Sequence, residues 1–173
     1  PEGQTSVPCS IIGLRHAAPY ELTDETSQAP NLLRFFLQYW LDDNTTASTK
    51  VYFTSVCLNG AYQSRKHRDH KNEGQSCIVS VGAYTGGELL TWGDDDGSLH
   101  PDNLREEDAT KHDIRKVLKF DGTKAHATCP FEGERYSVIW YSVIKPSDFT
   151  PVIRDCLETN GVKPMPPDAG GEE

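Results

Sequence analysis

Alternation of apolar and polar residues dominates the chain between positions 51 and 144 and predicts a series of short β-strands. The apolar segments are rich in β-branched and aromatic residues, which is typical of strands that bury one face. Glycine and proline residues separate the segments, notably at 85–87 and at 130–134. We expect strands at 51–58, 76–81, 88–92, 117–120 and 135–144, and one more short strand at 10–14.

Two segments outside this region follow a helical pattern instead. Apolar side chains repeat at i, i+3 and i+4 over residues 30–41, and the proline that opens this segment suits the first turn of a helix. Near the other end of the chain, Thr150 offers an N-cap for a closing helix over 151–160. The residues before 30 read as irregular apart from the short strand, and we expect the Pro- and Gly-rich tail at 163–173 to be flexible.

Many short strands with a flanking helix at each end favour a mainly β architecture, a double-stranded β-helix or jelly roll. The acidic stretch at 93–113 contains glycine and proline, so we expect an excursion from the sheet with a helical turn near 103–110. Within it, we expect residues 94–97 to form a solvated turn. The chain of 173 residues fits a single domain, 1–173, with a core from about 51 to 144.

The net charge and the cysteine content indicate which binding partners and which cellular compartment to expect. Seventeen basic and 26 acidic residues give a formal net charge of −9, which disfavours broad nonspecific binding to nucleic acid or anionic membranes. Basic residues nevertheless gather at 65–71 and at 111–124, and we read both groups as solvated edges. The five cysteines are widely spaced without a CxxC pair, which favours a reducing compartment.

We therefore expect an intracellular protein, nuclear or cytoplasmic, that does not insert in a membrane and is a monomer. No run of apolar residues reaches the roughly 18 positions of a membrane span. The chain begins at Pro1 without methionine, so we expect a processed form or part of a longer protein.

The candidate chemistry centres on His67 and Asp69. In an extended segment, residues two apart point the same way, so an imidazole and a carboxylate can share one metal ion. His126 would complete two histidines and one carboxylate, the facial set associated with non-haem Fe(II) and open coordination positions. Arg135 and Ser137 are again two apart on an expected strand, and their guanidinium and hydroxyl groups suit a dicarboxylate ligand. Each residue alone fits a structural role, so the joint pattern carries the prediction.

These residues follow one another in an order that resembles the Fe(II)/2-oxoglutarate-dependent dioxygenase superfamily. The resemblance covers about 51–144 and consists of His67-x-Asp69, the glycine pair in Gly86-Gly87-Glu88-Leu89, His126, and Arg135-Tyr136-Ser137.

The resemblance implies an enzyme that couples decarboxylation of 2-oxoglutarate to succinate with hydroxylation of a substrate C–H bond. It implies Fe(II) at the two histidines and the aspartate, with 2-oxoglutarate and O2 as co-substrates and ascorbate in support. Arg135 would hold the distal carboxylate of 2-oxoglutarate, with hydrogen bonds added by Ser137 and by Tyr62 or Ser64.

Within the superfamily, the segment His67-Arg68-Asp69-x-x-Asn72-x-Gly74 and the strand from Arg135 to Tyr141 resemble the TET/JBP group and its fungal and algal relatives. That group oxidises methyl groups on pyrimidine bases, and the resemblance places Asn72 at the flipped base. The final strand lacks the base-contacting histidine of TET enzymes.

The same glycine pair and final strand are also similar to prolyl hydroxylases of the oxygen-sensing type. The substrate therefore remains open between a methylated pyrimidine in nucleic acid and a prolyl peptide or small molecule. A cupin-like metal-binding module without catalysis is the alternative from another functional class.

Overall fold

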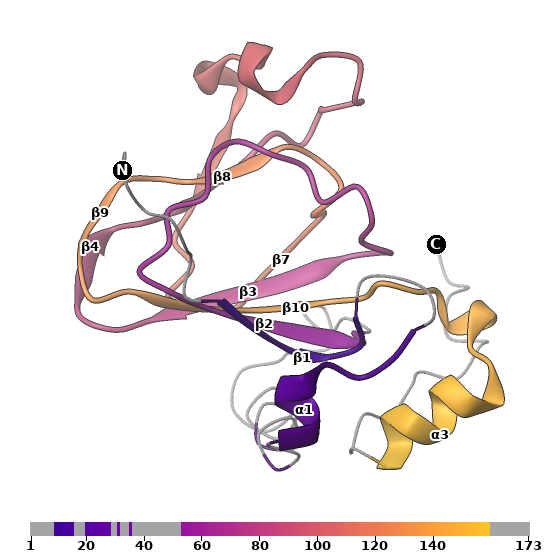
Figure 1. The fold of residues 1–173 in the computed structure, drawn as a ribbon. Helices are drawn as coiled ribbons and strands as arrows, with labels where there is room; N and C mark the ends of the chain where they lie inside the picture. The colour runs from indigo at the N-terminus through magenta and orange to yellow at the C-terminus, as the bar shows by residue number, and fades with distance from the viewer. Residues whose placement is uncertain (1–8, 16–19, 29–30, 32–34, 36–52, 160–173) are drawn as a thin grey trace.

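The computed structural model describes residues 9–15, 20–28, 31, 35 and 53–159 (Figure 1). The described helices are α1 (Asp24–Gln28) and α3 (Pro151–Thr159), with 3₁₀ turns at Pro101–Asn103, Glu106–Asp108 and Pro146–Asp148. The strands are β1 (Cys9–Gly13), β2 (Ser55–Gly60), β3 (Ser76–Val81), β4 (Tyr84–Gly86), β5 (Leu89–Thr91), β6 (Thr110–His112), β7 (Leu118–Phe120), β8 (His126–Thr128), β9 (Phe131–Gly133) and β10 (Tyr136–Tyr141).

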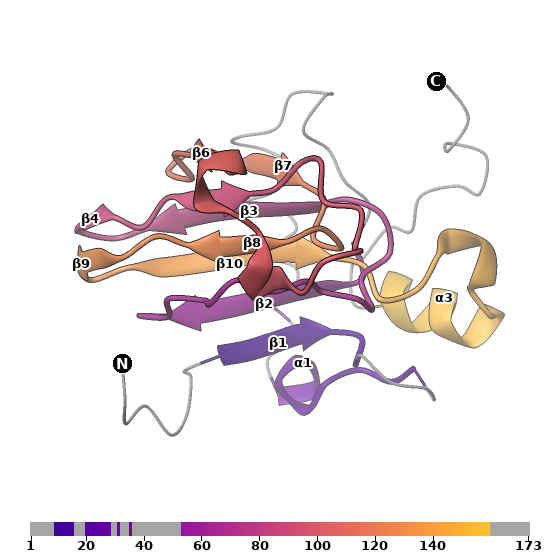
Figure 2. The same ribbon diagram turned by 90° about the horizontal axis from the view of Figure 1, so that it is seen from above.

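The strands form a double-stranded β-helix, which confirms the predicted jelly roll. A large antiparallel sheet has the order β1-β2-β10-β3-β7, and a smaller one has the order β6-β5-β8. The pair β4-β9 joins the two layers at one end of the molecule (Figures 1 and 2). Figure 1 shows α1 and α3 on the outer side of the large sheet, so its inner side faces the small sheet.

Alternation along the strands explains why the large sheet has two different faces. On the outer face, Val56, Val79 and Trp140 belong to a buried cluster that includes Ile153 and Leu157 of α3. Residues at the intervening positions point into the space between the sheets, because successive strand side chains alternate faces. A second buried cluster closes that space and is formed by Ile78, Leu89, Ile114 and Phe120. Full burial of each such side chain stabilises the fold by about 1.5–3 kcal/mol.

Several predicted elements match the structure closely. Strand β3 has the expected bounds, and β1 begins and ends one residue before the expected strand. The closing helix α3 covers nearly all of 151–160, and the backbone N–H of Ile153 donates to the Thr150 hydroxyl at 3.3 Å, as an N-cap requires. The expected helix at 30–41 lies outside the described residues apart from Asn31 and Phe35, and so does the tail at 163–173.

The sequence does not predict the short strands β4 and β9, because their glycine-containing segments have the composition of turns. Residues 85–87 and 130–134 instead contribute to β4 and β9, which pair from Tyr84↔Gly133 to Gly86↔Phe131. Gly86 and Gly133 have φ values of +74° and +99°, so glycine is needed for the backbone to bend within this tight pair. Glycine is therefore typical both of a turn and of a bent strand, and the sequence alone does not distinguish the two here.

Of two further local expectations, one is confirmed and one was wrong. The helical turn expected near 103–110 is present as the 3₁₀ turn at 106–108, with a second 3₁₀ turn before it at 101–103 and the start of β6 after it. The segment before residue 30 contains α1, a five-residue helix too short for a periodic pattern to reveal. Among the described residues, no helix is both long and apolar enough to cross a membrane.

Candidate active site

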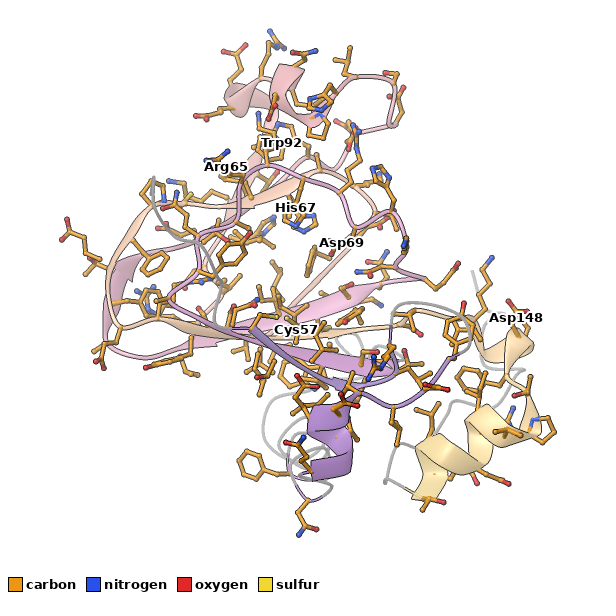
Figure 3. The ribbon with its side chains drawn as sticks, viewed as in Figure 1. Cys57, Arg65, His67, Asp69, Trp92 and Asp148 are labelled. Carbon is orange, nitrogen blue, oxygen red and sulfur yellow. The ribbon has the colours of Figure 1, made fainter. Side chains whose placement is uncertain are left out.

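His67, Asp69 and His126 come together at the opening between the two sheets. Their nearest ligand atoms all lie within 4.8 Å of one another. The Nε2 atoms of His67 and His126 lie 3.6 Å and 3.8 Å from the two carboxylate oxygens of Asp69. Two ligands bound to one ion at about 2.1 Å are roughly 3.0–3.4 Å apart, so the three side chains leave space for one metal ion. Figure 3 shows His67 and Asp69 facing the interior above Cys57 of the large sheet.

The backbone brings the two histidines together directly. His67 and His126 form an isolated antiparallel bridge, in which each backbone N–H donates to the other residue's carbonyl, at 3.0 Å and 2.9 Å. The Asp69 N–H donates to the Gly122 carbonyl at 2.9 Å. Ligands 57 residues apart in sequence, Asp69 and His126, are thus held by main-chain hydrogen bonds rather than by side-chain packing alone.

Both imidazoles are oriented for metal binding by the same kind of hydrogen bond. His67 Nδ1 lies 2.7 Å from the carbonyl of Arg65, and His126 Nδ1 lies 2.9 Å from the carbonyl of Lys124. A carbonyl only accepts, so Nδ1 carries the proton in each ring and Nε2 presents its lone pair. This arrangement fixes the tautomer that a metal requires.

The carboxylate of Asp69 is oriented by a neighbouring amide. The side chain of Asn72, which is 9% exposed, donates from Nδ2 to Asp69 Oδ2 at 3.1 Å. Gly122 packs against this pair, and a Cβ there would lie 3.2 Å from Asn72 Nδ2 and 3.4 Å from Asp69 Oδ2. Asn72 therefore supports the candidate metal ligand directly.

Burial keeps one ligand neutral and leaves the other two accessible. Burial lowers the pKa of His126, and the nearby His67 ring lowers it further. The side chain of His126 is 6% exposed, whereas those of His67 and Asp69 are 42% and 36% exposed. A neutral, buried imidazole is the form that binds a metal, and the exposed side is where solutes can approach.

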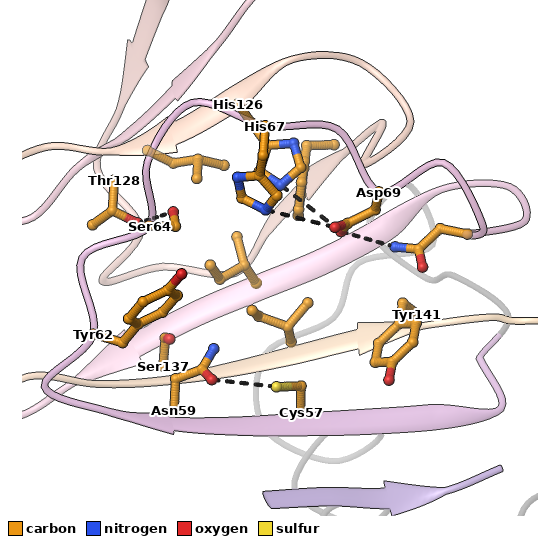
Figure 4. A pocket seen from close by; sticks show the side chains of 15 residues that line it. Cys57, Asn59, Tyr62, Ser64, His67, Asp69, His126, Thr128, Ser137 and Tyr141 are labelled. Carbon is orange, nitrogen blue, oxygen red and sulfur yellow. Dashed lines mark hydrogen bonds and ion pairs between the residues drawn. The ribbon is translucent and has the colours of Figure 1, made fainter. Parts of the chain in front are cut away.

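A cavity of about 250 Å³ extends from the three ligands between the sheets. Its floor is the inner face of the large sheet, and the inward residues of β10 are spaced two apart, as Ser137, Ile139 and Tyr141. In Figure 4 the imidazoles converge with Asp69 over this floor, while Asn59, Tyr62 and Ser137 line the other end. The remaining lining residues are Cys57, Ser64, Asn72, Ile78, Leu89, Phe120 and Thr128.

Arg135 lies two residues before Ser137 and so shares the inward face of the final strand. The residue is 2% exposed and does not line the cavity itself. Its Nη1 donates to the Tyr62 carbonyl at 3.3 Å, and its guanidinium lies 5.3 Å and 5.8 Å from the rings of Phe131 and Tyr84. Among the described residues, Arg135 Nε and Nη2 have no hydrogen-bond partner.

A buried guanidinium with two unpaired donors is costly, because arginine stays charged in a protein interior. Burial lowers its pKa, although the group remains protonated. An anion beside Arg135 would satisfy those donors. Gly87 makes room for this side chain, since a Cβ there would lie 2.9 Å from both Cδ and Nε of Arg135.

Tyr62 and Ser64, the other predicted contacts, both line the cavity. The hydroxyl of Ser64 lies 2.9 Å from that of Thr128 on β8. Tyr62 contributes its carbonyl to Arg135, as above, and its ring to the wall (Figure 4). The structure therefore places both residues on the cavity wall, with Tyr62 next to the guanidinium.

One expectation about the acidic turn at 94–97 was wrong. Asp95 is not solvated, since its side chain is 1% exposed and is paired with that of Arg68, which is 7% exposed. Arg68 also belongs to the group at 65–71, for which the sequence predicts a solvated basic edge. Hydrogen bonds from Arg68 hold the pKa of the Asp95 carboxyl well below its usual range. The partner is 27 residues away, so no local pattern distinguishes this aspartate from its neighbours.

Cys57 and Asn59 are cavity residues that the sequence did not single out. They occupy inward positions of β2, where the Cys57 thiol donates to Asn59 Oδ1 at 3.3 Å. Asn59 lies opposite Ser137 in the β2–β10 register. The alternation of the expected strand at 51–58 was the available signal, but Asn59 lies just beyond that range.

Comparisons with known proteins show a likeness of fold. No protein-family model and no curated protein matches the chain. Among solved structures, NgTET1 in complex with 5mC DNA matches 80% of this chain and 62% of its own chain, with a TM-score of 0.52 and 14% identity. This chain therefore spans less than two thirds of that protein.

Two weaker matches have TM-scores below 0.5. A Pseudomonas putida prolyl-4-hydroxylase matches with a TM-score of 0.38 and 16% identity, over 83% of this chain and 76% of its own. Escherichia coli YcfD, a ribosomal oxygenase in complex with cobalt and 2-oxoglutarate, matches with a TM-score of 0.41 and 9% identity, over 97% of this chain and 50% of its own. At these identities the comparison concerns the fold alone: the chain has a jelly-roll fold similar to that of NgTET1.

Proposed function

We propose that this chain is an Fe(II)/2-oxoglutarate-dependent dioxygenase that hydroxylates a substrate C–H bond. One observation carries the proposal: a facial set of two histidines and a carboxylate lies at one end of a cavity, and a buried guanidinium with two unpaired donors lies beside the other end. The first group suits Fe(II) with open positions. The second suits the distal carboxylate of a dicarboxylic acid.

The chain's own residues have separate tasks in this scheme. His67, Asp69 and His126 would hold Fe(II), which supplies the oxygen chemistry when bound. Arg135 would bind the distal carboxylate of 2-oxoglutarate, with the Ser137 hydroxyl beside it. Apolar walls from Leu89, Phe120 and Ile139 would keep water away from the reacting atoms.

A cupin-like module that binds a metal without turnover is the competing function. Such a module needs the three ligands but has no use for a charged side chain buried next to the cavity. Removing a guanidinium from water costs several kcal/mol, and the donors of Arg135 recover little of that in the protein alone. We therefore favour the enzyme.

The experiment that tests this function is a substrate panel with Fe(II), 2-oxoglutarate and O2. Succinate and oxidised product are measured by mass spectrometry for methylated DNA, methylated RNA, proline-containing peptides and small molecules. We expect succinate formation coupled to one class and abolished in Asp69→Ala. Metal binding without product from any class, and without succinate, would favour the module.

For the substrate we propose a pyrimidine base in nucleic acid. Support comes from the resemblance around Asn72 and from the fold likeness to a protein solved with 5mC DNA. Two cations of the basic group at 65–71 already have partners within the protein. Arg68 forms a buried ion pair with Asp95, and Lys66 donates to the Leu104 carbonyl at 2.6 Å. Arg65 and Lys71 remain exposed, and each lies two residues from a candidate metal ligand in the sequence, so we expect only a few phosphate contacts. A base would have to be flipped or single-stranded to reach the cavity.

Exchange of both exposed cations tests this substrate class. We expect Arg65→Gln/Lys71→Gln to weaken binding of methylated single-stranded DNA and to reduce the slope of log K against log salt by about 2, because each cation that no longer neutralises a phosphate lowers the slope by about one unit. Lys119→Gln/Lys116→Gln, two exposed lysines near or on β7, is the matched control. A wild-type protein with no salt-dependent affinity for DNA or RNA would move the proposal to a prolyl peptide or small molecule.

A glycine next to Arg135 gives a test of the co-substrate end of the cavity. Gly87 has φ +74°, so Gly87→Ala costs about 1–2 kcal/mol of backbone strain, and its Cβ displaces the Arg135 side chain. We expect lower stability and a weaker affinity for 2-oxoglutarate. Gly74→Ala is the matched control, because Gly74 has φ +71° with nothing within 4 Å of a Cβ. Its stability should fall similarly while its affinity for 2-oxoglutarate is retained; equal affinities in the two variants would contradict this role of Gly87.

A further inference from the structure

We propose that Arg68 and Asp95 are positioning residues that set the geometry of the metal site, an inference that rests on the metal binding proposed above. Arg68 stands between the two ligands His67 and Asp69, and its side chain points away from them. Its Nε donates to Asp95 Oδ2 at 2.7 Å and its Nη2 to Asp95 Oδ1 at 2.6 Å. Nη2 also donates to the Leu99 carbonyl at 2.8 Å. The segment that carries two ligands is thereby attached to the excursion after β5.

The same carboxylate also accepts a hydrogen bond from the backbone next to the third ligand. Asp95 Oδ2 accepts the backbone N–H of Ala125 at 2.7 Å, and Ala125 immediately precedes His126. The Ala125 carbonyl in turn accepts the N–H of Trp92 at 3.0 Å. One side chain, Asp95, thus connects the backbone that carries His67 and Asp69 with the backbone that carries His126.

The chemistry of this pair fits a geometric role better than a stabilising one. A buried ion pair gains little stability over apolar residues of similar size, because desolvation offsets the attraction. A bidentate guanidinium–carboxylate contact, however, fixes both distance and orientation. The carboxylate also accepts from Gly97 N–H at 3.1 Å, so its acceptor positions are occupied and its orientation is set.

The fold has other means of holding these segments together. The His67–His126 bridge and the bond from Asp69 N–H to Gly122 do not involve Arg68 or Asp95. We therefore expect loss of the pair to leave the jelly roll folded while the three ligands move relative to one another. Groups that orient metal ligands in this way typically contribute about 10- to 100-fold to metal affinity.

The test uses Co(II) binding to the purified, metal-free full chain. Asp95→Asn keeps the shape of the side chain but removes its charge and places an amide N–H against donors. We expect the dissociation constant for Co(II) to rise about 10- to 100-fold and the visible absorption bands, which report coordination geometry, to shift. Asp108→Asn is the matched control, because Asp108 forms the same bidentate contact with Arg105 at the exposed surface of the same excursion.

Arg68→Lys is the second variant, since it retains the positive charge but loses the fork. It should weaken Co(II) binding less than Asp95→Asn does, and it decides the matter if Asp95→Asn does not fold at the assay temperature. Co(II) affinities within about twofold of wild type in the folded variants, with unchanged spectra, would overturn the positioning role alone. A wild-type protein that does not bind Co(II) would instead overturn the metal site and the proposed function.

Discussion

His126→Ala should abolish metal-dependent stabilisation of this protein. A divalent metal at 100 times its dissociation constant stabilises the folded state by about 2.7 kcal/mol, which corresponds to roughly 5–11 °C in melting temperature for a chain of this size. His126 supplies one of three ligands and is the most buried of them. Its loss should weaken Mn(II) binding by more than the roughly 10- to 100-fold typical of outer partners. Thermal unfolding with and without Mn(II) measures the effect.

His70→Ala is the control for this experiment. His70 lies next to Asp69 in sequence but is exposed and belongs to no metal-ligand cluster among the described residues. It should retain the full shift in melting temperature. If His126→Ala shifts as much as wild type, the metal does not bind where the three side chains meet.

Arg135→Leu should weaken the binding of 2-oxoglutarate without lowering the stability of the unliganded protein. A charge-assisted hydrogen bond is worth about 1.5–3 kcal/mol, so loss of the guanidinium should weaken 2-oxoglutarate binding roughly 10- to 150-fold. The unliganded protein should unfold at the same temperature or higher, because the variant removes a buried charge whose Nε and Nη2 are unpaired in the described part of the chain. Calorimetric titration with 2-oxoglutarate in the presence of Mn(II), together with thermal unfolding, gives both quantities.

Arg115→Gln provides the comparison for Arg135. Arg115 lies 4.5 Å from the centre of the Tyr84 ring, which also neighbours Arg135, but its side chain is 46% exposed and pairs with Asp113. The substitution should leave the affinity for 2-oxoglutarate unchanged. Unchanged affinity in Arg135→Leu as well would remove this arginine from the binding site.

The parts of the fold that could be predicted are those in which local pattern and long-range packing agree. Strand β3 has six residues, and its side chains are buried on both faces of the sheet except at Val81. Its residue pattern was sufficient to predict the strand. The strands β4, β6, β8 and β9 have three residues each, which is too few for any period to show. Strands β5 and β7 are as short, but they lie within the longer apolar segments expected at 88–92 and 117–120. The existence of β4, β6, β8 and β9 depends on partners brought by the rest of the sheet.

The candidate site divides in the same way. The spacing of His67 and Asp69 predicts that they share a face of the strand. His126 was predicted as the third ligand because its position in the sequence matches the order of motifs in the resembled family. The structure adds the reason that they meet, the main-chain bridge between His67 and His126. Asp95 could not be predicted, because its burial depends on Arg68 and on Ala125, and neither is close in sequence.

Binding of 2-oxoglutarate with and without metal tests the central claim most directly, since it needs no knowledge of the substrate. The metal-free wild-type chain is titrated with 2-oxoglutarate by calorimetry, alone and after saturation with Mn(II), and Asp69→Ala is treated in the same way. We predict that wild type binds 2-oxoglutarate tightly only when Mn(II) is present and that Asp69→Ala does not gain this affinity. Equal affinity with and without Mn(II), or no binding in either case, would contradict a site built jointly by the metal ligands and Arg135.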